Sequence, residues 1–181
     1  MATSLRRKLE YEDYERIPSD GNRYEVLDGE LYMTPAPTPL HQRLSRRLQR
    51  TLEDYFHSRG LGEVFNAPID LILGRHDIAQ PDLLVVADPA HVTKRAIEGV
   101  PLLVVEVLSP STRALDRSVK MRRYAELGIV HYWVLDPDAE SLECLRLDAG
   151  AYRPIAAASV PDAVGHPDWP DLVIDLAALW R

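Results

Sequence analysis

The sequence predicts an α/β fold with a mixed central β-sheet flanked by helices. An apolar run over residues 102–108 is followed by a helical pattern over residues 115–127 and by a second β-prone run over residues 130–136. This order of strand, crossover helix and strand is a βαβ unit, whose two strands lie parallel in one sheet. An early hairpin signal, Asp28-Gly29 between two β-prone runs, and two late strands add antiparallel pairs. The sheet should therefore contain strands in both orientations.

The first part of the chain is expected to form a short helix, a hairpin and a long helix. A polar helix over residues 11–16 is closed by Pro18, and the hairpin spans residues 23–33. A proline-broken connector then leads into a helix over residues 40–59 that stops at Gly60. One face of this helix is apolar, because helical spacing brings together Leu44, Leu48, Leu52 and Tyr55.

The rest of the chain is expected to complete the sheet. Between the two helices, strands are predicted at residues 63–65, 69–73, 82–87 and 102–108. The second helix stops at Gly128, and the strand after it is turned by Asp136-Pro137-Asp138. The last β-prone runs are residues 142–147, 152–155 and 172–176. Since the sequence has no internal repeat and no linker, we expect residues 1–181 to form a single domain.

Composition restricts the class of protein. With 181 residues, 46% of them hydrophobic and 27% charged, the chain suits one globular domain. The net charge of −7 argues against a generic nucleic-acid coat protein, but carboxylate-rich metal sites also add negative charge, so a nuclease remains possible. No apolar stretch approaches the roughly 20 residues of a membrane span, and no secretory signal begins the chain, so we expect a cytoplasmic protein without membrane contact. A single cysteine, Cys144, and six scattered histidines predict neither a disulfide nor a zinc site.

Two carboxylates lie in segments that otherwise read as buried strands. Asp82 opens the strand after Pro81, and Glu106 lies inside an unbroken apolar run. A buried charge costs several kcal/mol unless a partner compensates it. Neighbouring strands are about 4.8 Å apart, so both acids can reach one ion, and their oxygens suit Mg²⁺ or Mn²⁺. The alternative is that Asp82 only begins a strand and that Glu106 forms a structural ion pair.

The helix that follows Glu106 carries further polar residues. Asp116, Lys120 and Tyr124 recur every four residues and so share one face of this helix. The helix starts beside Glu106 and must pack back onto the sheet, which brings Lys120 near the acids. Lys120 would be an ordinary solvated lysine on most helices. The preceding turn, residues 109–112, can cap the helix or hold a phosphate oxygen.

Six short motifs occur in order between residues 20 and 140. They are Tyr24-Glu25-Val26-Leu27-Asp28-Gly29-Glu30, His41 after a proline-rich connector, Gln80-Pro81-Asp82, Glu106-Val107-Leu108-Ser109-Pro110-Ser111-Thr112, Asp116 to Tyr124 with Lys120 between them, and Tyr132-Trp133-Val134-Leu135-Asp136-Pro137. This ordered set resembles the Uma-type restriction endonucleases of the PD-(D/E)XK nuclease superfamily. In the usual superfamily motif a lysine stands where this chain has Leu108, and the resemblance suggests that Lys120 supplies the missing amine.

The resemblance implies a restriction-endonuclease-like core and a metal site built on it. Asp82, Glu106 and the carbonyl of Val107 would hold Mg²⁺, with Mn²⁺ as a possible substitute. Lys120 would orient the attacking water or stabilise charge on the phosphate, and Glu25 would be the early acid of the site. The alternative is that Glu25 is only a polar residue of the hairpin. His41 would position the substrate, unless this histidine at a helix start is only structural.

Basic residues are the expected contacts to DNA. The first set lies on one stripe of the long helix and consists of Arg43, Arg46, Arg47 and Arg50. Arg113 and Arg117, near the start of the second helix, form the other set. Lys and Arg on such surfaces neutralise phosphates and release counterions. The alternative for the stripe is a solvated helix face. Tyr132 and Trp133 are expected in the core, because they lie in a β-prone run.

These observations predict a metal-dependent DNA endonuclease that hydrolyses phosphodiester bonds with a metal-activated water. By resemblance we expect a homodimer, since restriction-like nucleases commonly pair subunits to cut both strands. The first alternative is a catalytically silent nucleic-acid-binding or regulatory protein that retains a PD-(D/E)XK-like site. A metal-dependent hydrolase acting on RNA and an interaction module that dimerises through its central strands are the others. The set of two acids and a lysine favours the enzyme over the silent binder. Mg²⁺ binding that depends on Asp82 and Glu106 would support the site, whereas unchanged thermal stability in both mutants would count against it.

Overall fold

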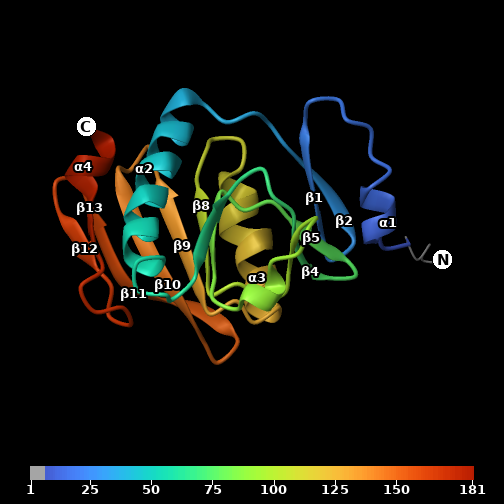
Figure 1. The fold of residues 1–181 in the computed structure, drawn as a ribbon. Helices are drawn as coiled ribbons and strands as arrows, with labels where there is room; N and C mark the ends of the chain where they lie inside the picture. Colours follow the sequence, from blue (N-terminus) through green and yellow to red (C-terminus); the bar gives the residue numbers. More distant parts are fainter. Residues whose placement is uncertain (1–6) are drawn as a thin grey trace.

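The computed structural model describes residues 7–181 and shows a layered α/β fold around a mixed six-stranded sheet (Figure 1). The first six residues, which belong to the segment examined for a secretory signal, lie outside the described part. The strand order is β11-β10-β9-β8-β6-β3, and only β8 and β9 pair in parallel. These strands are β3 (Glu63–Asn66), β6 (Leu83–Val86), β8 (Leu103–Val107), β9 (His131–Asp136), β10 (Ser141–Asp148) and β11 (Ala151–Ser159). The predicted α/β class and mixed sheet are confirmed.

Two smaller sheets accompany the central one. The five-stranded sheet has the order β2-β1-β5-β4-β7 and contains the predicted hairpin. Its strands are β1 (Arg23–Leu27), β2 (Glu30–Thr34), β4 (Leu71–Gly74), β5 (Asp77–Ala79) and β7 (Ile97–Glu98). Asp28 and Gly29 both have positive φ, as the Asp-Gly turn requires. A late hairpin is formed by β12 (Ala163–Gly165) and β13 (Val173–Asp175).

The described residues form six helices, two of which cover opposite faces of the central sheet. They are α1 (Tyr11–Tyr14), α2 (Pro39–Phe56), the 3₁₀-helix η1 (Pro89–His91), the π-helix η2 (Leu115–Lys120), α3 (Met121–Glu126) and α4 (Leu176–Trp180). In Figure 1, α2 and α3 lie on either side of the strands β8 and β9. None of the helices in residues 7–181 is long and apolar enough to cross a membrane.

Helix α2 covers one face of the sheet through the apolar stripe that the spacing predicts. Thr38 caps it by accepting the amide hydrogen of His41, and Pro39 occupies the first turn. Leu44, Leu48 and Leu52 are fully buried in one core cluster with Trp133. Burying such side chains contributes about 1.5–3 kcal/mol each. The opposite face of the sheet has its own core, which contains Tyr124, Tyr132 and Val134. Tyr132 and Trp133 are thus core residues, as expected.

The second helix differs from its prediction in form. Its first six residues form a π-helix, and only Met121–Glu126 is α-helical. A π-turn is wider than an α-turn and is frequent at functional sites. Asp116, Lys120 and Tyr124 nevertheless share one buried face. The predicted common face is therefore correct, although the regular helix expected over residues 115–127 is not.

Other predicted boundaries were also wrong. The short strands β5, β7 and β12 were not expected, because two or three residues give too little alternation to identify a strand. The strand expected at 152–155 continues to Ser159. The run expected over 172–176 ends at Asp175, whose side chain accepts the Ala178 amide hydrogen and so begins α4 at Leu176.

Candidate active site

Asp82 and Glu106 lie side by side at one end of the central sheet. Strands β6 and β8 pair antiparallel with Leu83 opposite Val105, and continuing this register places Asp82 opposite Glu106. The amide nitrogen of Val107 donates to Asp82 Oδ2 at 2.9 Å. The two acids are only 7% and 2% exposed. The structure therefore brings together the two acids that the sequence singled out.

Lys120 lies at the centre of the acidic cluster. Its Nζ is 3.0 Å from Glu106 Oε1, 3.0 Å from Glu25 Oε2 and 3.6 Å from Asp116 Oδ1. The lysine is 3% exposed, so it is not a solvated surface residue. The hydroxyl of Tyr124 donates to the same Glu106 oxygen at 3.2 Å. The face of η2 and α3 that carries these residues thus faces Glu106.

Glu25 connects the five-stranded sheet, called the small sheet below, to this cluster. It lies on β1, and its Oε1 accepts the amide hydrogen of Gln80 at 2.8 Å. Its Oε2 accepts from the Thr34 hydroxyl at 3.2 Å in addition to facing Lys120. Glu25 is 1% exposed, so these contacts form inside the protein. They hold the segment that leads into Asp82.

His41 and Arg23 face Asp82 from other elements. His41, in the first turn of α2, places Nε2 3.0 Å from Asp82 Oδ2. Arg23, at the start of β1, has Nη1 3.8 Å from the other carboxylate oxygen, Oδ1. The sequence-based hypothesis gave His41 a substrate contact and did not include Arg23 or Gln80. Gln80 was visible only as part of a motif, whereas Arg23 carried no signal, because the acid that it faces, Asp82, lies far from it in the sequence.

Negative charge dominates the cluster. Three carboxylates, those of Glu25, Glu106 and Asp116, face one buried ammonium group, and a fourth, that of Asp82, lies beside Glu106. Desolvation raises the pKa of Glu106 well above its ordinary value, although Lys120 acts in the opposite direction. Desolvation likewise raises the pKa of Asp116. Desolvation also acts to lower the pKa of Lys120, but the attraction of Glu106, Glu25 and Asp116 outweighs it and raises that pKa. An added cation would favour the ionised form of these acids.

The oxygen atoms at the site suit a divalent cation such as Mg²⁺. Among residues 7–181, the hydrogen bonds and ion pairs of Glu106 end on Oε1, which leaves Oε2 for a ligand. Asp82 Oδ2 contacts His41 and accepts the amide hydrogen of Val107. The contact of Oδ1 within residues 7–181 is the longer ion pair with Arg23, at 3.8 Å, so Oδ1 is the freer oxygen for a cation. Mg²⁺ is usually bound by one or two carboxylates together with waters and substrate phosphate. Val107 offers its amide hydrogen to Asp82, a contact that the sequence did not suggest.

A cavity of about 280 Å³ gives access to the cluster. Its wall includes Asp82, Glu106, Asp116 and Lys120. The turn over residues 109–112 forms another part of the wall. Within this turn, the hydroxyl group of Ser109 hydrogen-bonds to those of Ser111 and Thr112. The acids and the lysine are therefore buried but reachable by small molecules.

The family model described as "Putative restriction endonuclease", Uma2, matches residues 11–177. The chain belongs to the Uma2 family. An uncharacterized protein of Synechocystis sp. is 30% identical over 128 residues, which is 70% of this chain and 64% of the relative. The crystal structure of a "putative nuclease belonging to DUF820" from Anabaena variabilis aligns with a TM-score of 0.75 at 15% identity, covering 95% of this chain and 97% of the other. That structural likeness shows that the two chains share this mixed α/β fold.

The structure separates the arginines of this Uma2-family chain into two groups. Arg43 and Arg46 line a second cavity of about 650 Å³, whose wall also contains Arg23, His41 and Asp82. This cavity therefore leads from the basic stripe of α2 to the acidic cluster. Asp82 and His41 belong to the walls of both cavities.

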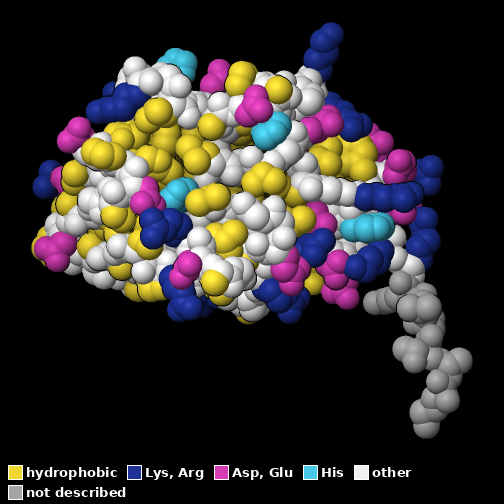
Figure 2. Space-filling view, turned by 90° about the horizontal axis from the view of Figure 1, so that it is seen from below, with side chains coloured by type: hydrophobic (Ala, Val, Ile, Leu, Met, Phe, Trp, Pro, Cys, Tyr) yellow, Lys and Arg dark blue, Asp and Glu magenta, His cyan; other side chains and the backbone are white. Residues whose placement is uncertain are grey.

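Three of the other predicted basic contacts are engaged within the protein, whereas Arg50 is exposed and lies outside the wall of this cavity. Arg47 donates to the carbonyl of Leu179 at 2.6 Å and so fastens α4 to α2. Arg113 forms ion pairs with Asp136 and Asp138, and Arg117 pairs with Glu143. On the face seen in Figure 2, basic side chains alternate with acidic ones. Arg43 and Arg46 are thus the stripe residues placed best for a ligand at the site.

Proposed function

We propose that this chain is a metal-dependent DNA endonuclease that hydrolyses phosphodiester bonds. The observation that carries the proposal is the convergence of Asp82, Glu106 and Lys120 in one cavity of an Uma2-family fold. A structural ion pair needs one acid for one lysine, whereas here Lys120 faces three carboxylates and a fourth lies beside them. This excess of negative charge favours a divalent cation, and we propose Mg²⁺ with Mn²⁺ as a substitute.

Each residue of the site has a distinct role in the proposed reaction. Asp82 and Glu106, with the Val107 carbonyl, would hold the cation, and a bound cation would polarise the scissile phosphate and lower the pKa of a water. Glu25 anchors Lys120, and completes the acidic shell. Because Lys120 holds its proton firmly, it acts as a positive group that orients the water and stabilises charge on the phosphate oxygens. It does not act as the base.

In this proposal DNA approaches along the larger cavity, the one that is lined by Arg43 and Arg46 of α2. Arg43 and Arg46 contact phosphates, and His41 orients Asp82 through their 3.0 Å contact while lying on the path of the substrate. Arg47, Arg113 and Arg117, which belonged to the original basic set, keep at most an indirect part, because each is bound within the protein. We further propose that the enzyme acts in the cytoplasm as a homodimer, so that one subunit cuts each strand.

Nicking of supercoiled plasmid DNA tests the catalytic proposal. Wild-type protein should relax and linearise the plasmid in Mg²⁺, and EDTA should stop it. Asp82→Asn and Glu106→Gln should lower the rate by at least about 100-fold, because they remove ligands of the cation. Asp54→Asn, at an exposed position of α2, is the matched control and should cut as wild type does. Equal nicking by wild type and both site variants would contradict the proposal.

A catalytically silent DNA-binding protein is the second candidate. The observation in its favour is the direct 3.0 Å contact between Lys120 and Glu106, which stabilises the buried acid without any ion. This candidate predicts retained DNA binding without nicking in either Mg²⁺ or Mn²⁺. Calorimetric titration with Mg²⁺ separates the two, because the silent protein would bind no cation through Asp82 and Glu106.

A further inference from the structure

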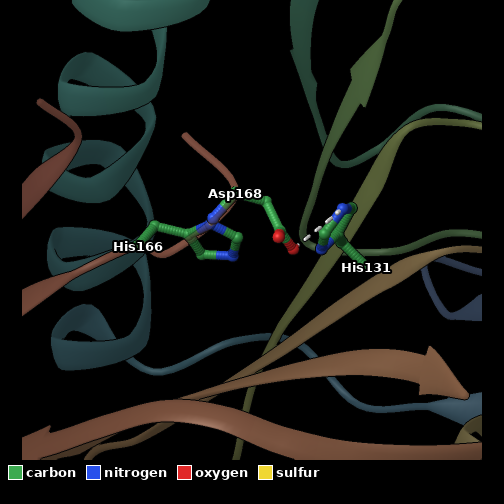
Figure 3. Close-up of side chains that lie close together, drawn as sticks. All are labelled: His131, His166 and Asp168. Carbon is green, nitrogen blue, oxygen red and sulfur yellow. Dashed lines mark hydrogen bonds and ion pairs between the residues drawn. The ribbon is translucent and has the colours of Figure 1, made fainter. Parts of the chain in front are cut away.

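Two histidines and an aspartate converge on the side of the central sheet opposite the acidic cluster. His131 is the first residue of β9, while His166 and Asp168 lie in the loop between β12 and β13 (Figure 3). One ligand atom from each residue lies within 4.8 Å of the others. No motif in the sequence predicts this group, because 34 residues separate His131 from the next of the three.

The pairing of β8 with β9 separates this group from the candidate active site. His131 pairs with Leu103 and shares its face of the sheet with Trp133, under α2. Glu106, three residues after Leu103, faces the other side, toward Tyr124. Neighbouring residues of a strand point to opposite faces, so an ion near His131 cannot also contact Glu106. The group is thus independent of the proposed nuclease function.

Burial favours the neutral form of both imidazoles, which is the form that binds metals. His131 and His166 are each 5% exposed, and burial lowers the pKa of both, to about 4 for His166. They are therefore neutral near pH 7. Each ring also keeps a buried nitrogen, Nδ1 of His131 and Nε2 of His166, that has no hydrogen-bond partner in the described part of the chain. Such nitrogens are uncommon in native interiors and call for an explanation.

The carboxylate of Asp168 is held in place by a basic neighbour. Arg146 on β10 donates to its Oδ1 at 2.7 Å, and the other oxygen, Oδ2, lies 4.0 Å from His131 Nε2. Figure 3 shows this carboxylate between the two rings. Ligands of a tetrahedral zinc lie about 3.4 Å apart, since each bond is about 2.0–2.1 Å long. A modest contraction of the group therefore gives a coordination shell.

We propose that His131, His166 and Asp168 form a second metal site, which binds one Zn²⁺ or a similar transition-metal ion. Imidazole ligands prefer Zn²⁺, Co²⁺ or Ni²⁺ to Mg²⁺, so the site differs in selectivity from the carboxylate cluster. Two histidines and one carboxylate leave a fourth position for water. Because His166 Nδ1 accepts the amide hydrogen of Asp168 at 3.2 Å, the proton of the neutral ring lies on Nε2. Metal binding through Nε2 therefore moves this proton to Nδ1, and the hydrogen bond from Asp168 is given up in exchange for the metal bond.

The ion would fasten the late hairpin to the central sheet. His166 and Asp168 lie between β12 and β13, whereas His131 belongs to β9. Trp169 of the same loop stacks on His166, with ring centroids 4.1 Å apart, and packs against His131 at 4.4 Å. The aromatic contacts position the rings, and the ion joins them. Metal binding to the folded state alone raises stability in proportion to the logarithm of metal concentration over Kd.

Titration of metal-stripped protein with Zn²⁺ and with Co²⁺ tests this site. Wild type should bind one equivalent of Zn²⁺ at the histidines, and the Co²⁺ form should show the strong visible absorption of a tetrahedral ion with nitrogen ligands. Both signals should persist in the double variant Asp82→Asn/Glu106→Gln. They should weaken at least about tenfold in His166→Gln and in Asp168→Asn, because each loses a ligand. His57→Gln, at an exposed position, is the control and should bind as wild type does.

Thermal melting keeps the test decisive if His166→Gln fails to fold. Zn²⁺ should raise the Tm of wild type and of the Asp82→Asn/Glu106→Gln variant, but not of Asp168→Asn, whose side chain is 29% exposed. Asp168→Asn should still nick plasmid DNA in Mg²⁺, which separates this proposal from the nuclease proposal. A wild type that binds no Zn²⁺, binding that survives in Asp168→Asn, or binding lost in the active-site double variant would each overturn the second site.

Discussion

Replacing Lys120 by methionine tests whether this lysine balances the acidic cluster. The substitution keeps most of the aliphatic stem but removes the ammonium group that faces Glu106, Glu25 and Asp116. Removing one partner of a buried ion pair costs about 3–5 kcal/mol, because the remaining charge is uncompensated. For a chain of this length, 3 kcal/mol corresponds to a fall in Tm of about 6–12 °C. We expect that loss near pH 8 in EDTA.

The loss should depend on pH in a defined direction. The folded-state pKa of Glu106 is raised above its ordinary value, so protonated Glu106 suits the folded protein. The contribution of Glu106 to the free energy of unfolding is fully present below about 4.5, the pKa of this group in the unfolded chain. It is lost as the pH rises through the pKa of Glu106 in the folded protein. Without Lys120 that pKa rises further, because the attraction of the ammonium group is gone. The Lys120→Met variant should therefore approach wild-type stability near pH 5.

Urea unfolding at pH 5 and pH 8, with EDTA or with Mg²⁺, measures these effects. Mg²⁺ should return part of the lost stability at pH 8, because a bound cation replaces the missing positive charge. Lys94→Met, at an exposed position, is the control and should change the unfolding free energy by less than about 0.5 kcal/mol. If Lys120→Met matches wild type at pH 8 in EDTA, Lys120 does not balance the cluster and the electrostatic argument is wrong.

Two further predictions concern the surroundings of the site. His41→Ala removes the 3.0 Å contact to Asp82 and should weaken Mg²⁺ binding about 10–100-fold by calorimetry, while unchanged affinity would show that His41 does not orient the acid. The double variant Arg43→Glu/Arg46→Glu should weaken DNA binding and reduce the slope of log K against log salt by about 2, whereas Arg50→Glu, outside the cavity wall, should have a smaller effect. Identical slopes in fluorescence anisotropy would remove the cavity from the DNA path.

The sequence predicted those parts of the site that have a local signal. Glu106 was recognisable because a charge interrupts an aliphatic strand, and Lys120 because it follows Asp116 by four residues on a helix that packs on that strand. The Asp28-Gly29 turn likewise identified the hairpin that carries Glu25. These features depend on residues close together in the chain, where periodicity and turn chemistry apply.

The remaining features depend on contacts between distant segments. Arg23 faces Asp82 only because the fold brings the start of β1 close to the residue before β6, and no sequence spacing predicts this contact. The sequence did not predict the ion pair between Arg113 and Asp136 either. Arg113, which was predicted to contact DNA, therefore forms an internal ion pair. Likewise, His131 and His166 meet only after the late hairpin folds onto the sheet. Sequence spacing identifies faces of single elements but not which faces meet.

The hydrogen bond from the Gln80 amide to Glu25 gives a direct measure of site assembly. It joins the small sheet to the segment that leads into Asp82, so it exists only while the hairpin is docked. An amide hydrogen exchanges with solvent when its bond opens, and local openings need far less free energy than global unfolding. The exchange rate at Gln80 therefore reports how often the site comes apart in a protein that is otherwise folded. Any ligand that slows this exchange more than that of the core amides acts by keeping the small sheet in place.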